Sequence, residues 1–247
     1  MDLTTSWQRA LPAAVRDRYQ LAETRSAAGY LQACAGEAFA DLIGVLAEFR
    51  LTLADLTTPG GSKSPVAARL DRCFRVAGWR EAQHDLEFVS RWTVFPHRPA
   101  GEAAPTVEVH RVRGSGHRVD NVKGKVALEV EWNAKDGNLD RDLANFRALH
   151  EAGVIDVGVI VTRSHERIHY AANYLSRLAG RLAAPRADGQ PAGRFATTTT
   201  TNIEKLIPRL QRGDAGGCPV LAVAFTDRCY APGPGDPALP IAEEFDW

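Results

Sequence analysis

The sequence predicts an α/β (α+β) protein built on a mixed β-sheet flanked by helices. Three observations support this fold class. Apolar residues recur at helical spacing in the first part of the chain, alternating apolar and polar residues follow from residue 106, and short β-branched runs then alternate with further helical patterns. Such an order is typical of a sheet with helices packed against it.

The composition of the chain is that of an ordinary globular protein. It has 247 residues, of which 45% are hydrophobic and 24% charged, and its formal net charge is +0. No apolar run approaches the ~20 residues that span a bilayer, and the N-terminus does not resemble a signal peptide, so we expect no membrane partner. The four cysteines contain no CxxC pair, so we expect buried free thiols in a reducing cytoplasm rather than a zinc finger.

The N-terminal part, about residues 1–95, is predicted to be mainly helical. Residues 36–56 and 66–79 carry apolar side chains at helical spacing, and the segment between them contains Pro and Gly. No linker separates this part from the core predicted at about 106–226. We therefore expect a single domain spanning residues 1–247.

The predicted core begins with a β-meander. Residues 106–112 alternate like a strand, residues 117–122 extend, and residues 126–132 extend again after a turn. Helical patterns and short buried strands then alternate. We expect helices over 137–153, 166–183 and 202–213, strands over 154–162 and 218–226, and an irregular tail.

The last strand of this meander carries two glutamates on one face. Because side chains alternate along a strand, Glu129 and Glu131 project from the same side, about 7 Å apart between Cα atoms. If the chain turns at 123–124, Asp120 on the preceding strand lies opposite Ala127 and diagonal to Glu129. Carboxylates this close repel one another unless a cation neutralises them, and Mg²⁺ prefers oxygen ligands. The alternative is a solvated strand face whose glutamates pair with nearby lysines.

Basic residues surround these acids in the sequence. Residues 110–125 contain five lysines or arginines and one acid, Asp120. A basic rim binds backbone phosphates, and acids within it are suited to hold a catalytic metal. This combination favours a phosphodiester substrate, although a basic hairpin also promotes solubility and charge alone does not decide.

The segment 119–163, with "EVEWNAKD", "DRDL" and "GVIVTR", resembles the core of the BglII/BstYI family of type II restriction endonucleases. The segments 59–79 and 203–226 resemble further parts of that family. The resemblance implies a PD-(D/E)XK nuclease fold and a homodimer that cuts both strands of palindromic double-stranded DNA with Mg²⁺, leaving 5′-phosphates. It also implies functional pairing with a cognate DNA methyltransferase that protects the host's own sites.

The resemblance assigns roles to residues of the meander. Asp120, Glu129 and the backbone carbonyl of Val130 are the expected metal ligands. Glu131 stands where the wider superfamily has lysine, and it is expected to ligate a second metal or to orient or deprotonate the attacking water. The expected catalytic residues are Asp120, Glu129 and Glu131.

Polar residues that follow the two central strands are expected to contact DNA, because side chains on rigid supports can read base edges. Two residues of a glycine-containing loop and two near the catalytic acids are expected to join them. The expected DNA-binding residues are Lys63, Ser64, Arg118, Asn121, Asn133, Lys135, Asp136, Arg163, Ser164 and His165. The alternative for these positions is ordinary helix capping and solvent exposure, with Asp136 as a possible N-cap.

Two other functions remain open from the sequence. One is a structure-specific or repair nuclease on the same core. The other is a DNA-binding protein that does not cleave, against which the presence of all three expected catalytic acids argues.

Overall fold

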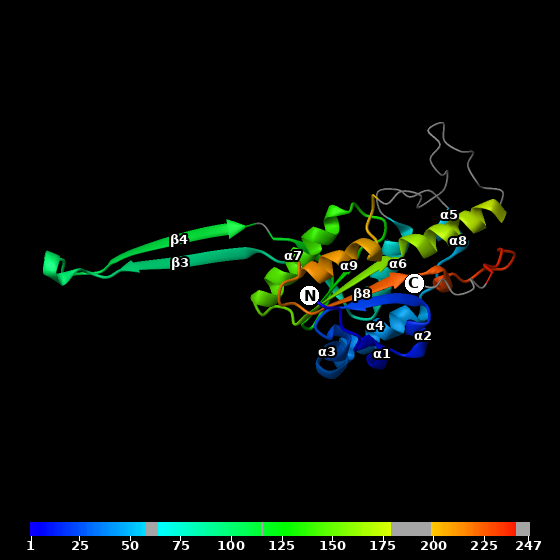
Figure 1. Ribbon diagram of the computed structural model, residues 1–247, viewed down its shortest axis with the longest axis horizontal. Helices are drawn as coiled ribbons and strands as arrows, with labels where there is room; N and C mark the ends of the chain where they lie inside the picture. Colours follow the sequence, from blue (N-terminus) through cyan, green and yellow to red (C-terminus); the bar gives the residue numbers. More distant parts are fainter. Residues whose placement is uncertain (58–63, 115, 179–198, 241–247) are drawn as a thin grey trace, which may run out of the picture.

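A computed structural model of the protein (Figure 1) describes residues 1–57, 64–114, 116–178 and 199–240. These residues form a six-stranded sheet and a separate two-stranded hairpin. In spatial order, the strands of the main sheet are β1 (Tyr19–Glu23), β8 (Val220–Phe225), β7 (Val157–Arg163), β6 (Val126–Val130), β5 (Arg118–Lys123) and β2 (Arg80–Gln83). Strands β6, β7 and β8 are parallel, whereas β1, β5 and β2 pair antiparallel with their neighbours.

Helices cover both faces of this sheet and confirm the predicted fold class. One face packs against α7 (Gly137–Glu151) and α9 (Ile203–Arg212), whose apolar residues recur at helical spacing. The other face packs against the remaining helices. These are α1 (Trp7–Ala10), α2 (Ala13–Arg16), α3 (Ala27–Cys34), α4 (Gly36–Glu48), α5 (Leu53–Thr57), α6 (Pro65–Val76) and α8 (His165–Leu178).

The close approach of α7 to the sheet depends on Gly158 in β7. A Cβ atom at this position would lie 2.3 Å from Cδ2 of Phe146, a fully buried residue of α7. No side chain fits there unless the helix moves away from the strand. Gly158 therefore sets the distance between the sheet and the helix that faces the glutamates of β6.

The prediction of a mainly helical N-terminal part needs correction. Strands β1 and β2 lie within residues 1–95, and both join the main sheet. Strand β1 pairs antiparallel with β8, so this edge of the sheet comes from the start of the chain. The helix predicted over 36–56 is also interrupted between α4 and α5. Both strands are short, and their partners lie far away in sequence, so local periodicity does not reveal them.

The predicted meander also needs correction at its first strand. Strand β4 (Thr106–Gly114) pairs with β3 (Leu86–Val94), not with β5, and the segment between them is the tip of a hairpin. Alternation along β4 is the same with either partner, so the pattern identified the strand but not its neighbour. The end of the helix predicted over 166–183 lies outside the described residues.

The four cysteines differ in part from their expected burial. All four cysteines are free, but Cys34 and Cys73 are exposed, which corrects the expectation that all are buried. Each lies on the outer side of a helix whose opposite side is apolar.

Within the described ranges, no single helix has the length and hydropathy to cross a bilayer, and only the bent pair α3–α4 would pass on length and composition if taken together.

Replacing Gly158 with alanine is expected to destabilise the protein by about 1–3 kcal/mol, because the new methyl group overlaps Phe146. Urea unfolding measures the change in the free energy of unfolding. Gly44→Ala in α4 is the matched control, since a Cβ there meets nothing within 4 Å and alanine favours a helix. Equal effects of the two substitutions on the free energy of unfolding would show that the contact with Phe146 does not restrict the side chain at position 158.

Candidate active site

The pairing of β5 with β6 brings two of the predicted catalytic acids together. The register pairs Asn121 with Leu128 and Val122 with Ala127. The sequence had predicted Asp120 opposite Ala127, and this register was wrong. Asp120 lies just beyond the paired positions, where its backbone N–H donates to the Glu129 carboxylate.

The reason for the shift is the turn between the two strands. Lys123 pairs with Val126, which leaves Gly124 and Lys125 as a two-residue loop. Gly124 has φ +56°, and glycine with positive φ at the first central position is characteristic of a type II′ hairpin turn. The turn is thus centred one residue later than expected, which moves every cross-strand partner.

Hydrogen bonds tie the two acids to each other's strands. The backbone N–H of Asp120 donates to Oε2 of Glu129 at 3.2 Å. The backbone N–H of Val130 donates to Oδ2 of Asp120 at 3.3 Å. The side chain of Val130 is buried in the core on the opposite face of the sheet. The carboxylates therefore stay at the strand pair rather than extending into solvent.

Glu129 of β6 and Glu131, which directly follows that strand, are both buried, and a further carboxylate joins them from α7. Glu129 is 3% exposed, Glu131 4% and Asp142 2%. Burial is the largest cause that raises the pKa of all three groups, and repulsion from Asp142 is the next cause for both glutamates. Asp120 adds to this repulsion. The alternative of a solvated strand face is therefore wrong: the glutamates belong to an acidic cluster, defined here as the buried Glu129, Glu131 and Asp142 with the half-buried Asp120.

Few donors compensate this acidic cluster. Arg141 Nη2 lies 3.0 Å from Oδ1 of Asp142 and 3.9 Å from Oε1 of Glu131. Asn138 Nδ2 donates to the Glu131 carboxylate at 3.5 Å. Two buried oxygens, Oε1 of Glu129 and Oδ2 of Asp142, have no hydrogen-bond partner. Among the described residues, the guanidinium of Arg141 is the cation in contact with Glu131 and Asp142, and the unpartnered oxygens of Glu129 and Asp142 remain costly to bury.

The donor chemistry of the acidic cluster fits a hard divalent cation. Carboxylate oxygens, two of them buried and unpartnered, are the ligands that Mg²⁺ and Ca²⁺ prefer. Within the described ranges, no three His, Cys, Asp or Glu side chains are already grouped to hold a metal ion. The residues thus supply suitable ligands, and binding would require the side chains to draw together.

The chain that leaves β6 is held by two threonine hydroxyls. Thr162 Oγ1 and Thr201 Oγ1 each donate to the backbone carbonyl of Glu131 at 2.9 Å. Thr201 also accepts from the backbone N–H of Ala134 at 3.1 Å. Asn133 between them has φ +60°, a left-handed conformation uncommon for a residue other than glycine. These contacts fix the direction in which the chain leaves the acidic cluster.

Three predicted DNA-binding residues lie in the segment that follows Glu131 in the sequence. Asn133 is half-buried and Lys135 is exposed. Asp136 precedes the first residue of α7, but its side chain makes no capping hydrogen bond. Its carboxylate instead lies 3.0 Å from Lys205 Nζ and 3.3 Å from Arg209 Nη2 of α9. Lys135 is the most accessible of the three.

The predicted DNA-binding residues after β7 are less accessible than expected. Arg163 and Ser164 are both fully buried. Arg163 Nη2 donates to Thr200 Oγ1 at 2.9 Å, and Ser164 Oγ donates to Glu204 Oε1 at 2.7 Å. His165, by contrast, is partly exposed at the start of α8. The first two side chains therefore support the end of the strand rather than face solvent.

The remaining predicted DNA-binding residues are scattered. Arg118 is largely exposed and pairs with Glu81 at 3.3 Å. Asn121 is fully buried and donates to Oδ1 of Asp71 at 3.0 Å, so its side chain does not face solvent. Ser64 is the half-buried residue that precedes α6. Lys63 lies outside the described residues.

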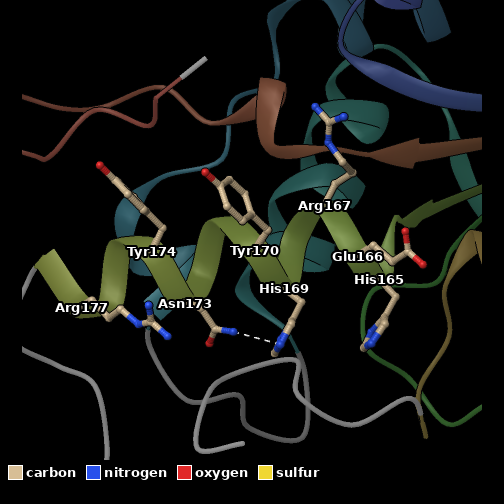
Figure 2. Close-up of a pocket in the computed structure, with 8 residues that line it drawn as sticks. All are labelled: His165, Glu166, Arg167, His169, Tyr170, Asn173, Tyr174 and Arg177. Atoms are coloured by element: carbon tan, nitrogen blue, oxygen red, sulfur yellow. Dashed lines mark hydrogen bonds between the residues drawn. The ribbon is translucent and has the colours of Figure 1, made fainter. Parts of the chain in front are cut away.

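Sequence reasoning missed two sets of residues. Asp142 and Arg141 belong to a helix whose polar residues gave no sign of which would face β6. A polar row on α8 begins at the predicted His165, and its other members were also missed, although their four-residue spacing is visible in the sequence. Figure 2 shows this row. The rings of His165 and His169 are stacked with their centroids 5.8 Å apart, and Asn173 is hydrogen-bonded to His169 at 2.9 Å. Its members are His165, His169, Asn173 and Arg177.

Comparison with known proteins identifies one family. The sequence matches the family described as "Restriction endonuclease BglII/BglIII" over residues 19–225, which is most of the chain. The matched region contains every strand of the main sheet and all four residues of the acidic cluster. No curated protein gives a significant match.

Replacing Glu131 with glutamine is expected to stabilise the metal-free protein by about 2 kcal/mol at pH 8. The unfolded wild-type chain releases the Glu131 proton at this pH, whereas the raised pKa favours its retention in the folded state, which costs stability. The difference shrinks as the pH falls toward the ordinary pKa of a carboxyl group, because both states then bind the proton. Thermal unfolding in EDTA measures it.

Glu151→Gln is the matched control for this comparison. Glu151 lies on α7 with an exposed side chain and pairs with Arg147 at 2.8 Å, so its replacement is expected to change stability by less than about 0.5 kcal/mol. A Glu131→Gln variant that is no more stable than wild type at pH 8 would contradict the electrostatic cost assigned to the cluster.

Proposed function

Because the chain belongs to the BglII/BglIII family of restriction endonucleases, we propose that it is a type II enzyme that cuts both strands of palindromic double-stranded DNA. One observation carries this proposal. Asp120 of β5 and Glu129 of β6 contact each other across the strand pair, and Glu131 follows two residues later, just after β6. Carboxylates placed in this way at the end of a sheet strand suit hydrolysis of a phosphodiester.

We further propose that Mg²⁺ binds to Asp120, Glu129 and the backbone carbonyl of Val130. The buried, unpartnered oxygen of Glu129 supports this assignment, because a buried carboxylate is costly without a cation or donor. When bound, the cation would polarise the scissile phosphate and stabilise charge on the leaving oxygen. Asp142 contributes negative charge behind these ligands and strengthens the preference of the site for a cation.

Glu131 is the residue we assign to the attacking water. It lies beside the proposed ligands on the same strand face, and its backbone is held by Thr162 and Thr201. From this position its carboxylate can orient the water and accept its proton. Attack on phosphorus then breaks the bond to the 3′-oxygen and leaves a 5′-phosphate. Arg141 limits the negative charge that accumulates around Glu131.

We propose that DNA contacts come from the accessible residues around the cluster. Asn133 and Lys135 leave the catalytic strand toward solvent, Arg118 adds positive charge beside β5, and His165 begins the polar row on α8. Asparagine, arginine and lysine are common readers of base edges and phosphates. The buried Asn121, Arg163 and Ser164 then act as supports for these elements.

A palindromic site requires two equivalent active sites related by a two-fold axis. We therefore propose a homodimer in which each chain forms one nuclease domain. The host would need a cognate DNA methyltransferase to protect its own copies of the site.

Glu129→Ala is expected to reduce Mg²⁺-dependent cleavage at least about 1,000-fold, because it removes a ligand of the metal that drives hydrolysis. DNA binding in Ca²⁺ is expected to persist. Digestion of unmethylated plasmid DNA with sequencing of the ends measures cleavage, and discrete fragments are expected. Glu151→Ala, on the exposed side of α7, serves as the control. Wild-type nicking only at branches or lesions would indicate a repair nuclease, and binding without cleavage would indicate a non-catalytic protein.

Mg²⁺ is expected to raise the melting temperature of the wild-type protein in the absence of DNA, because binding to the folded state alone stabilises it. EDTA should reverse the shift. The variant Asp120→Asn with Glu129→Gln is expected to lose it while remaining folded. A shift of equal size in this double variant would place the metal elsewhere and refute the ligand assignment without involving any activity assay.

A further inference from the structure

The β3–β4 hairpin projects from the rest of the molecule (Figure 1). Its two strands pair in register from Leu86 with Gly114 to Val94 with Thr106. Nearly every residue in it is exposed. A two-stranded hairpin is at best marginally stable by itself in water, so a hairpin of this length and exposure gains from a surface to pack on.

The base of the hairpin is held in a defined place. A Cβ atom on Gly116 would lie 1.0 Å from the carbonyl oxygen of His84, so the two chain segments cross with no room for a side chain. The Gly116 N–H donates to Oδ1 of Asp85 at 3.2 Å, and the His84 N–H donates to the carbonyl of His117 at 3.0 Å. These contacts connect the hairpin to β2 and to β5, and β5 carries Asp120 of the acidic cluster.

The two faces of the hairpin differ in chemistry. Residues directly opposite each other in an antiparallel pair share a face. One face, here called the arginine face, carries Arg91, Arg111 and Arg113, with Arg113 paired to Glu87 at 3.3 Å. The other, here called the apolar face, has no lysine or arginine. It consists of Leu86, Phe88, Ser90, Trp92, Val94, Thr106, Glu108, His110, Val112 and Gly114.

The apolar face is large enough to matter for assembly. Phe88 is 67% exposed and Trp92 64%, and Leu86, Val94 and Val112 are each about half exposed or more. At about 150–250 Å² for a full aromatic side chain, these five residues offer on the order of 400–500 Å² of apolar surface. Two such faces packed together would bury roughly 1,000 Å², about the lower limit for a specific interface.

We propose that the apolar face packs against the same face of a second copy of the chain, so that two hairpins form a four-stranded, two-layer sandwich. A two-fold interface brings identical patches together, so the patch must be compatible with itself. The apolar face meets this condition, because its one acid, Glu108, has His110 at 3.5 Å on the same face. Stacked sheets with apolar inner faces are a standard way to bury such residues.

The same chemistry argues against DNA as the occupant of this face. The apolar face has no permanent cation to pair with phosphates, and Glu108 would repel them. The arginine face points the other way and stays accessible when the apolar faces are packed together. The proposal rests on the homodimer of the proposed function and names the surface that forms it.

The test measures self-association without DNA or metal, so that it is independent of cleavage. Sedimentation equilibrium of Phe88→Ser with Trp92→Ser is expected to show a dimer dissociation constant at least about 100-fold weaker than wild type, as for loss of two central aromatic anchors. Val89→Ser with Val109→Ser is the matched control. These valines lie on the arginine face at 52% and 47% exposure, and their replacement is expected to leave dimerisation unchanged.

A second measurement uses the wild-type protein and does not depend on how variants fold. Amide hydrogen exchange in β3 and β4 is expected to slow as the protein concentration rises, while exchange in β7 stays constant. The proposal is overturned if the wild type is monomeric at micromolar concentration, or if the Phe88–Trp92 variant dimerises as well as the control. Retained dimerisation with weaker DNA binding in Ca²⁺ would also overturn it and assign the face to DNA.

Discussion

The antiparallel pairing of β5 with β6 brings Asp120 and Glu129 together, and α7 covers them with a further acid, Asp142. Glu131 lies beside them, and the guanidinium of Arg141 contacts Glu131 and Asp142. Such a concentration of buried negative charge opposes folding of the chain alone. In the proposed function, a divalent cation would offset this charge, so the same carboxylates that lower the stability of the metal-free protein would bind the metal.

The surrounding fold holds the acidic cluster on rigid elements. Gly158 brings α7 close to the sheet, and the hydroxyls of Thr162 and Thr201 anchor the backbone of Glu131. Because β6 and β7 are parallel, their carboxyl ends meet at one edge, where Asn133 and His165 emerge. The proposed catalytic acids and the accessible polar groups are therefore supported by the same part of the sheet.

Local patterns in the sequence were enough to identify strand β6, its two faces and its two glutamates, because alternation is a property of the strand itself. The turn before β6 was misplaced by one residue, which shifts each cross-strand partner on β6 by two, because the turn position depends on the conformation of Gly124. Asp142 was missed because the orientation of α7 is decided by packing on Gly158. Burial of Arg163 was also missed, because its partner Thr200 comes from a distant segment. In each case the missing information is a turn conformation or a contact between distant segments, which the local sequence pattern does not contain.

The most direct test of the central claim is to locate a bound metal in crystals grown with Mn²⁺, by anomalous diffraction. The account predicts a peak between Asp120 and Glu129, within about 2.3 Å of their carboxylate oxygens. A well-occupied Mn²⁺ peak bound only to other residues would contradict it. So would an acidic cluster that stays without metal at millimolar Mn²⁺ while the crystals contain DNA.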